Sequence, residues 1–154
     1  MDDQIKTTAE AAEADALPRM HEVHSDPAAD TVGNRPLPNC IAKKPVAQKS
    51  EAQWAYERTV LYLKKFEEGL DDGQEIAMGF AGTDAGVLKI EGMGYFDPDI
   101  VTFYGADPSG AKMQLVQHVS QLSVVFRAVP KRIETAPPNR IGFKLFQDLE
   151  QGSA

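Results

Sequence analysis

The sequence predicts an α+β domain, mainly β, in which an N-terminal amphipathic helix precedes a small, strongly bent barrel of five antiparallel strands. Apolar residues recur every three or four positions between residues 50 and 69, which is a helical period. From residue 74 onward they alternate with a period of two, as in half-buried strands. Gly92 and Gly94 interrupt the second strand, which indicates a bulge or bend. Short strands with such a bend are typical of a small closed barrel.

The predicted helix has a recognisable start and end. Ser50 with Gln53 three residues later forms a capping box, and Gly69 follows the last helical turn. We expect its aromatic residues to pack on the sheet rather than to stack on a ligand. The two predicted faces are an apolar one (Tyr56, Val60, Leu63, Phe66, with Trp54 near the start) and a polar one (Glu57, Arg58, Lys64, Lys65).

The five predicted strands follow one another with short turns. The segment 107–110, Asp-Pro-Ser-Gly, is typical of a hairpin turn, and Pro130 closes the last strand. The segment 100–104 is β-branched and aromatic, so we expect it to be buried on both faces. The segment 141–149 is compatible with either an extra strand or a short helix. The alternating positions of the other strands are Ile76, Met78, Phe80; Leu88, Ile90; Ala111, Met113, Leu115; and 124–129.

The chain divides into a disordered N-terminal tail, 1–49, and one folded domain, 50–150. The tail carries five prolines and no sustained apolar period, so it cannot bury enough surface to offset its ordering entropy. The acidic start predicts no secretory signal, and no apolar run approaches the roughly 20 residues that span a bilayer. A single cysteine, Cys40, fits a reducing cytoplasm.

Few residues fit catalysis or metal binding. Asp97 and Asp99 flank Pro98 and could be paired carboxylates for acid–base chemistry. A simpler interpretation is that they are turn residues whose side chains bond nearby backbone N–H groups. His118 could carry a proton or contact RNA, or it could close a strand end. The donors in 21–24, with Asp26 and Cys40, lack the helix that aligns a zinc motif, so we expect no metal site and no cofactor.

Charge is unevenly distributed along the chain. The net charge is −7, which argues against general nucleic-acid binding. Residues 51–107 hold twelve acidic and four basic side chains, whereas residues 112–145 hold six basic side chains and one acidic. The two segments could neutralise each other, or the basic segment could form a surface for an anionic partner, either RNA or the acidic face of another subunit. The candidate cations for such a surface are Arg127, Lys131, Arg132 and Arg140.

Four stretches, WAYERTVLYLKKFEEGLDD, FDPDIVTFYG, LVQHVSQLSVVFRAVPKR and NRIGFKL, resemble a bacterial family defined by a domain of unknown function. More distantly, the order of one helix and five bent strands is similar to the Sm-like RNA chaperone family Hfq. Phe96-Asp97 before 100–103 resembles the junction of that family's second and third strands, and 117–119 resembles its turn before the last strand. The resemblance implies that His118 lines a pore that contacts uridine-rich RNA. Gln117 stands where the family has lysine, which leaves that pore without its cation.

We therefore expect a non-enzymatic, Sm-like binding or scaffold domain that self-associates through strand edges and contacts an anionic partner such as RNA. Open strand edges offer a backbone template for a homo-oligomer, and head-to-tail pairing closes into a ring when the rotation allows it. One alternative is a protein-interaction adaptor that uses the tail. Another is a small hydrolase or isomerase that uses His118 with Asp97 or Asp99. Nothing in the sequence indicates a membrane partner or DNA specificity.

Overall fold

The computed structural model describes residues 19–28, 35–80, 86–131 and 133–152. The chain forms two compact units, 1–42 and 43–154. In the first unit, the described residues form the two-residue strands β1 (Arg19–Met20) and β2 (Arg35–Pro36), which pair antiparallel, and the single turn α2 (Asn39–Ala42). Much of the predicted tail lies outside the described residues, so its disorder stays a prediction.

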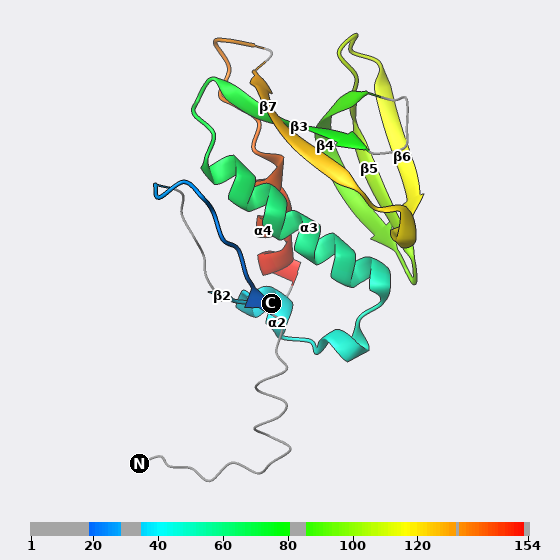
Figure 1. Cartoon of the computed structure of the whole chain (residues 1–154). Helices are drawn as coiled ribbons and strands as arrows, with labels where there is room; N and C mark the ends of the chain where they lie inside the picture. The colour runs from blue at the N-terminus through cyan, green and yellow to red at the C-terminus, as the bar shows by residue number, and fades with distance from the viewer. Residues whose placement is uncertain (1–18, 29–34, 81–85, 132, 153–154) are drawn as a thin grey trace. The chain divides into compact units, whose positions relative to one another are not determined.

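The second unit is an antiparallel five-stranded sheet with two helices (Figure 1). A short 3-10 turn, η1 (Val46–Gln48), leads into helix α3 (Glu51–Glu68). The strand order is β6-β5-β4-β3-β7, so the last strand lies beside the first and the others form a meander. The strands are β3 (Gln74–Phe80), β4 (Val87–Phe96), β5 (Ile100–Ala106), β6 (Lys112–His118) and β7 (Val124–Pro130).

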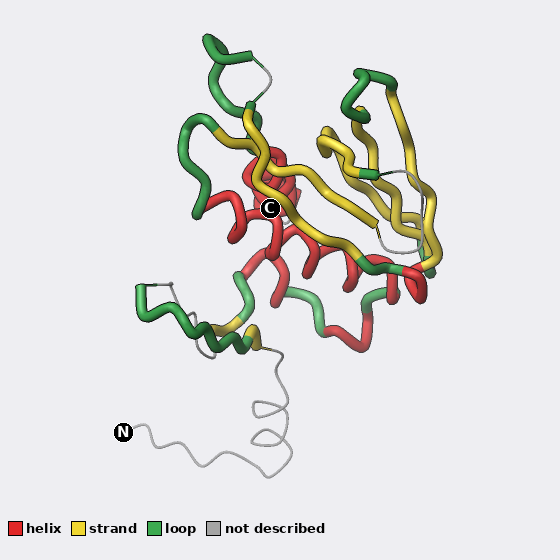
Figure 2. The backbone as a smooth tube through the Cα atoms, turned by 45° about the horizontal axis from the view of Figure 1, so that its top comes forward, coloured by secondary structure: helices red, strands yellow, loops and turns green. Residues whose placement is uncertain are grey.

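The prediction of a closed barrel is wrong, because the sheet stays open. Among the described residues, β6 pairs only with β5 and β7 only with β3. The 3-10 turn η2 (Val119–Gln121) carries the chain from one edge of the sheet to the opposite edge without joining them. The bulge between Ile90 and Gly92 bends β4 where we expected a bend, and the sheet curls strongly (Figure 2). Helices α3 and α4 contribute apolar side chains to the core that the sheet encloses, so the core does not depend on closure.

Helix α3 confirms the predicted start and end. The Ser50 hydroxyl accepts a hydrogen bond from the Gln53 N–H at 2.9 Å, and Gly69 is the C-cap. Only this half of the predicted capping box forms, because the Gln53 side-chain amide donates to the Glu57 carboxylate at 3.2 Å.

Tyr56, Val60 and Leu63 are buried as predicted, and the partly buried Phe66 packs edge-on against Phe126 of β7. Trp54 does not join this core, and the Arg58 guanidinium lies 4.4 Å from the centre of its ring. Glu57 was predicted to face solvent but is only 4% exposed. Its carboxylate lies 2.5 Å from the ammonium of Lys49, and a buried carboxylate requires such a partner.

The described helices cover the inner face of the sheet and leave its outer face uncovered. Val101 and Phe103 of β5 point inward and are fully buried. The Phe103 ring packs edge-on against the Phe80 ring, with 4.9 Å between the ring centroids. Tyr104, which points outward, is 43% exposed. Burial of β5 on both faces was therefore a wrong prediction, because the described helices pack on one face of the sheet only.

The segment whose type the sequence left open is helix α4 (Ile141–Gly152). Its apolar residues join the core beside α3. The two helices approach closely at Gly142, where an added Cβ would lie 2.7 Å from the Lys64 backbone nitrogen. The Glu67 carboxylate of α3 accepts a hydrogen bond from the Phe143 N–H at 3.1 Å, near the N-terminus of α4. Within the described residues, neither α3 nor α4 is apolar over the length that a bilayer crossing requires.

Candidate functional site

The residues that the Hfq resemblance singles out lie at one end of the sheet, where β6 ends. Gln117 points inward and is 9% exposed, and its Oε1 has no hydrogen-bond partner among the described residues. His118 points outward, across from Ile100 of β5. The two neighbours therefore lie on opposite faces of the sheet and cannot act on one ligand from the same side.

His118 closes this end of the sheet through three contacts. Its Nδ1 accepts a hydrogen bond from the Ser120 N–H at 3.1 Å and lies 2.8 Å from the Ser120 hydroxyl. Its Nε2 lies 3.2 Å from the Asp99 carboxylate. These distances suit an imidazole whose Nε2 carries the proton and whose Nδ1 accepts. His118 thus caps η2 and ties that turn to the β4–β5 turn.

A serine, a histidine and a carboxylate in contact are the groups of a hydrolytic relay, and sequence reasoning had paired His118 with Asp97 or Asp99 but had missed Ser120. The geometry brings His118 to Asp99 and not to Asp97. The side chains of His118 and Asp99 are 49% and 40% exposed, and neither lines one of the two hollows described below. A hydrolytic relay would also need a site that holds substrate and excludes water.

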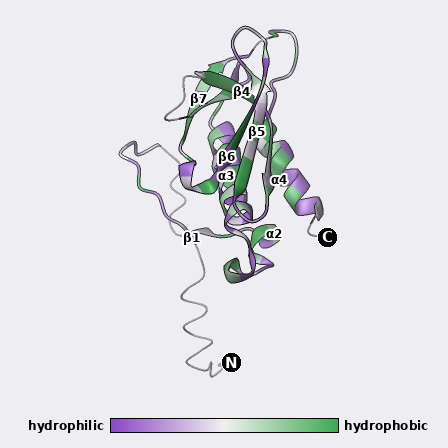
Figure 3. Ribbon diagram, turned by 90° about the vertical axis from the view of Figure 1, so that its right-hand side faces the viewer, coloured by the Kyte–Doolittle hydropathy of each residue, from purple (hydrophilic) through white to green (hydrophobic). Residues whose placement is uncertain are grey.

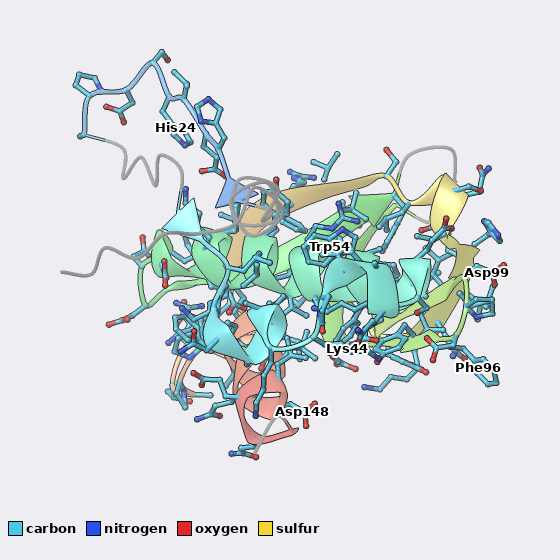
Figure 4. The ribbon with its side chains drawn as sticks, turned by 90° about the horizontal axis from the view of Figure 1, so that it is seen from below. His24, Lys44, Trp54, Phe96, Asp99 and Asp148 are labelled. Carbon is cyan, nitrogen blue, oxygen red and sulfur yellow. The ribbon has the colours of Figure 1, made fainter. Side chains whose placement is uncertain are left out.

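The β4–β5 turn is also fastened to the start of α3. The Asp97 carboxylate accepts a hydrogen bond from the Ser50 hydroxyl at 2.5 Å, and the Ala52 N–H donates to the Pro98 carbonyl at 3.0 Å. Burial raises the pKa of the neighbouring Tyr95 phenol, and the Asp97 charge raises it further. Phe96 and Asp99 lie at this end of the molecule (Figure 4), and Phe96 is 75% exposed.

Two of the candidate cations hold the fold together. Arg140 donates from Nη1 to the Gln74 carbonyl at 2.6 Å and from Nη2 to the Asp71 carbonyl at 3.0 Å. Lys131 donates from Nζ to the Ala136 carbonyl at 2.9 Å. Their donors satisfy backbone acceptors around the segment that leads into α4. They are therefore less available to an anionic partner than their sequence positions suggest.

The remaining candidate cations divide differently. Arg132 lies outside the described residues. Arg127 is exposed on the outer face of β7, and no hydrogen bond or ion pair joins its side chain to another described residue. The sheet register places it in one row with two lysines of the same face, Lys89 and Lys112, separated by Ala77 and Ala106. Adjacent strands lie about 4.8 Å apart, so successive cations of this row are roughly 10 Å apart.

Acidic residues accompany the two lysines of that row. Lys112 pairs with Glu91 at 2.9 Å, and Lys89 pairs with Glu75 at 3.0 Å. Burial alone would raise the pKa of Glu75, but the Asn139 N–H and the Lys89 ammonium outweigh it and lower that pKa. The predicted neutralisation between the acidic and basic segments thus occurs at Lys112 with Glu91. Among the described candidate cations, Arg127 is the one whose side chain makes no such contact.

The described residues form two hollows that lie on the outer face of the sheet. The first, about 290 Å³, has mainly apolar walls, with Lys89 and Asp107 as its charged members. Asp107 accepts hydrogen bonds from the Ser109 and Ala111 N–H groups, so its carboxylate serves the hairpin turn. The second hollow, about 260 Å³, has polar and aromatic walls on β4, β5 and β6. Sequence reasoning missed the second hollow because it expected Tyr104 to be buried.

No metal centre emerges from the described part of the chain, where no three His, Cys, Asp or Glu side chains group closely enough to hold an ion. His24 lies 3.2 Å from the Glu22 carboxylate, which accounts for one of the donors singled out in the sequence.

Comparisons with known proteins identify no relative of this chain. No family model matches it, and neither a curated protein nor a solved structure is similar to it at a significant level. The resemblances to a bacterial domain of unknown function and to the Sm-like family therefore find no support there. Any function has to be argued from the geometry of the open sheet.

Proposed function

We propose that the protein is a non-enzymatic scaffold domain, Sm-like in its order of one helix and five antiparallel strands, whose copies join edge to edge. The observation that carries this proposal is the pair of open edges, β6 and β7, which have the same length of seven residues. Each presents a row of backbone N–H and C=O groups to a new neighbour. Pairing β6 of one copy with β7 of the next satisfies both edges and extends the sheet.

Side chains favour one register for that pairing. Val116 on β6 is 59% exposed and Val125 on β7 is 58% exposed, and both point to the outer face. Within one copy β6 and β7 run in the same direction, because every neighbouring pair of strands in the sheet is antiparallel. A head-to-tail pair that keeps the outer faces of both copies on one side is therefore parallel. When Val116 lies beside Val125 in such a pair, Leu115 lies beside Val124 on the inner face. Slipping by one residue would place inner-face side chains opposite outer-face ones, so the apolar pattern opposes it. In the register with Val116 at Val125, apolar side chains meet on both faces of the sheet.

Such contacts are head-to-tail, since a different surface of each copy takes part. Head-to-tail assemblies form a closed ring when the rotation per subunit closes and a filament when it does not. Backbone pairing together with apolar contacts is the usual chemistry of strand addition. The assembly would display one copy of the outer face per subunit, which is the arrangement a scaffold needs.

Substituting both edge valines tests the interface. Val116→Lys with Val125→Lys places like charges directly opposite each other, and we expect light scattering to give the monomer mass at concentrations where the native protein is oligomeric. Both positions are exposed, so the fold should persist, as circular dichroism would show. Val116→Glu with Val125→Lys is the matched control, because opposite charges at the same positions should restore the oligomer. A native protein that is monomeric throughout, or a double-lysine variant that still assembles, contradicts edge pairing.

Two exposed cations of the outer face, Arg127 and Lys112, support contact with an anionic partner such as RNA. The Lys112 side chain is 78% exposed. We expect a short uridine-rich RNA to bind at low salt and its affinity to fall as salt rises, because cations release counterions from phosphates. Arg127→Met removes about one phosphate contact, so the slope of log affinity against log salt concentration should become shallower by about one. Fluorescence anisotropy across a salt series measures both. The absence of binding at low salt contradicts the RNA part of the proposal and leaves edge pairing intact.

A further inference from the structure

The second outer-face hollow combines an aromatic surface with polar side chains. It measures about 260 Å³, somewhat less than the roughly 300–1,000 Å³ of pockets that hold drug-sized ligands. A single planar ring system is therefore the largest group it would enclose. Figure 3 looks onto β5 and β6, which carry most of this surface. Its lining residues are Glu91, Tyr104, Gly105, Lys112, Met113 and Gln114.

Tyr104 supplies the aromatic surface. Its partner in the register is Gly92 of β4, and a Cβ added at Gly92 would lie 3.5 Å from the Tyr104 ring. The tyrosine side chain therefore lies against the β4 strand at a position without a side chain of its own. The residue remains 43% exposed. An exposed aromatic ring held against a sheet in this way is a platform on which another ring can stack.

The polar residues lie on β6 and at the bulge of β4. Gln114 is directly opposite Tyr104, and its amide, which makes no hydrogen bond to another described residue, can donate and accept at once. Lys112 lies two residues away on the same face and pairs with Glu91 at 2.9 Å. Exposed ion pairs contribute little to stability, so a ligand can compete for either partner.

Charge decides between a phosphate and a ring as the recognised group. Glu91 offsets Lys112, so a bare anion would meet a site with little net positive charge. A neutral heteroaromatic ring has no such disadvantage, and its hydrogen-bonding edge matches the donors and acceptors of Gln114 and Glu91. Lys112 can then reach a phosphate attached to the ring through a sugar.

From this geometry we infer that the hollow is a nucleobase site. The base stacks on Tyr104, Gln114 hydrogen-bonds its edge, and Lys112 contacts the attached phosphate. This inference deepens the RNA part of the proposed function but does not rest on edge pairing, because every lining residue belongs to one copy. The same chemistry is offered by a free nucleotide and by a base of a single strand.

Binding experiments on the full chain separate these sources. The probes are adenosine and uridine monophosphate, ribose 5-phosphate as the control without a base, and single-stranded oligoadenylate and oligouridylate. We expect the nucleotides, but not ribose 5-phosphate, to shift the backbone amide signals of Tyr104 and Gln114 in NMR titrations. Binding of mononucleotides indicates a free-nucleotide site, and binding of the oligonucleotides alone indicates a single-strand site; both support a nucleobase. Absence of binding by all four base-containing probes overturns the inference.

Matched variants test the residues. Tyr104→Leu should weaken binding about tenfold or more, whereas Tyr104→Phe should keep most of the affinity because the stacking ring remains. Tyr62→Leu is the control, since Tyr62 is 48% exposed on α3 and away from the hollow's lining. Lys112→Met should weaken the binding of nucleotides more than that of the corresponding nucleosides. Equal affinities of Tyr104→Leu and the native protein, with both folded, overturn the inference. If the monomeric double-lysine variant still binds a base, the nucleobase site does not depend on edge pairing. If the native protein is an oligomer that binds no base, the nucleobase site is wrong and edge pairing is unaffected.

Discussion

Gly105→Ala is expected to destabilise the protein by about 3 kcal/mol, at the upper end of the cost of overpacking. A Cβ at Gly105 would overlap the carbonyl oxygen of Lys89 on the adjacent strand. That oxygen belongs to the backbone and cannot rotate away, so β4 and β5 would have to separate just before the bulge. Urea unfolding followed by circular dichroism measures the loss.

Gly79→Ala is the matched control for this substitution. Gly79 also lies inside a strand, β3, but an added Cβ there would meet nothing within 4 Å. Alanine also lowers the entropy of the unfolded chain, so we expect a change within about 1 kcal/mol. If the two variants unfold at the same urea concentration, β4 and β5 do not approach each other as closely at Gly105 as described.

Glu67 is the second position with a large expected effect. Its side chain is 2% exposed, one carboxylate oxygen accepts the Phe143 N–H, and the other has no partner among the described residues. Glu67→Ala removes the carboxylate that accepts the Phe143 N–H in the first turn of α4, and it leaves a cavity between α3 and α4. We expect a loss of about 2–3 kcal/mol in the free energy of unfolding. Glu67→Gln keeps an acceptor without the charge and should be much milder.

The pH dependence of Glu67→Gln gives a more specific test. Burial raises the pKa of Glu67 above its ordinary value of 4.5, although backbone N–H groups of α4 and the Arg140 charge partly oppose the shift. The folded state therefore holds the proton more tightly than the unfolded chain does. The stabilisation from this proton is complete below the unfolded value and is lost as pH rises through the folded pKa.

Relative to the native protein, Glu67→Gln should therefore gain stability as pH rises from about 4 towards neutrality. Taking the difference between the two proteins at each pH removes the contributions of other groups, such as Glu75, whose lowered pKa acts in the opposite direction. Urea unfolding at several pH values measures this difference. A difference that is constant with pH, or that shrinks as pH rises, means that the Glu67 carboxylate is not buried as described.

Local patterns predicted the elements of the second unit well. The Ser50 cap, the Gly69 end of α3, the hairpin turn at 107–110 and the bulge at Gly92 follow from the preferences of a few adjacent residues. Such preferences need no knowledge of distant neighbours, and the structure confirms them. The period of two likewise identified the inner faces of β3 and β6.

The candidate site was harder to predict, because it depends on which faces meet. His118 was singled out from the sequence, but its contacts with Ser120 and Asp99 join a turn to a segment 19 residues earlier. Tyr104 was assigned to the core because β-branched and aromatic runs are typical of strands buried on both faces. A pattern within one strand cannot show that the described helices cover only one side of the sheet.

The sequence by itself determined where this chain forms a capped helix and five strands, and which side chains of most strands share a face. Tertiary structure alone decided that the sheet stays open and that 141–152 is a helix. It also decided that Arg140 and Lys131 bind backbone carbonyls and that Tyr104 stays exposed. The physical reason is that periodicity and capping are local, whereas closure, coverage and partner choice depend on contacts between residues far apart in the chain.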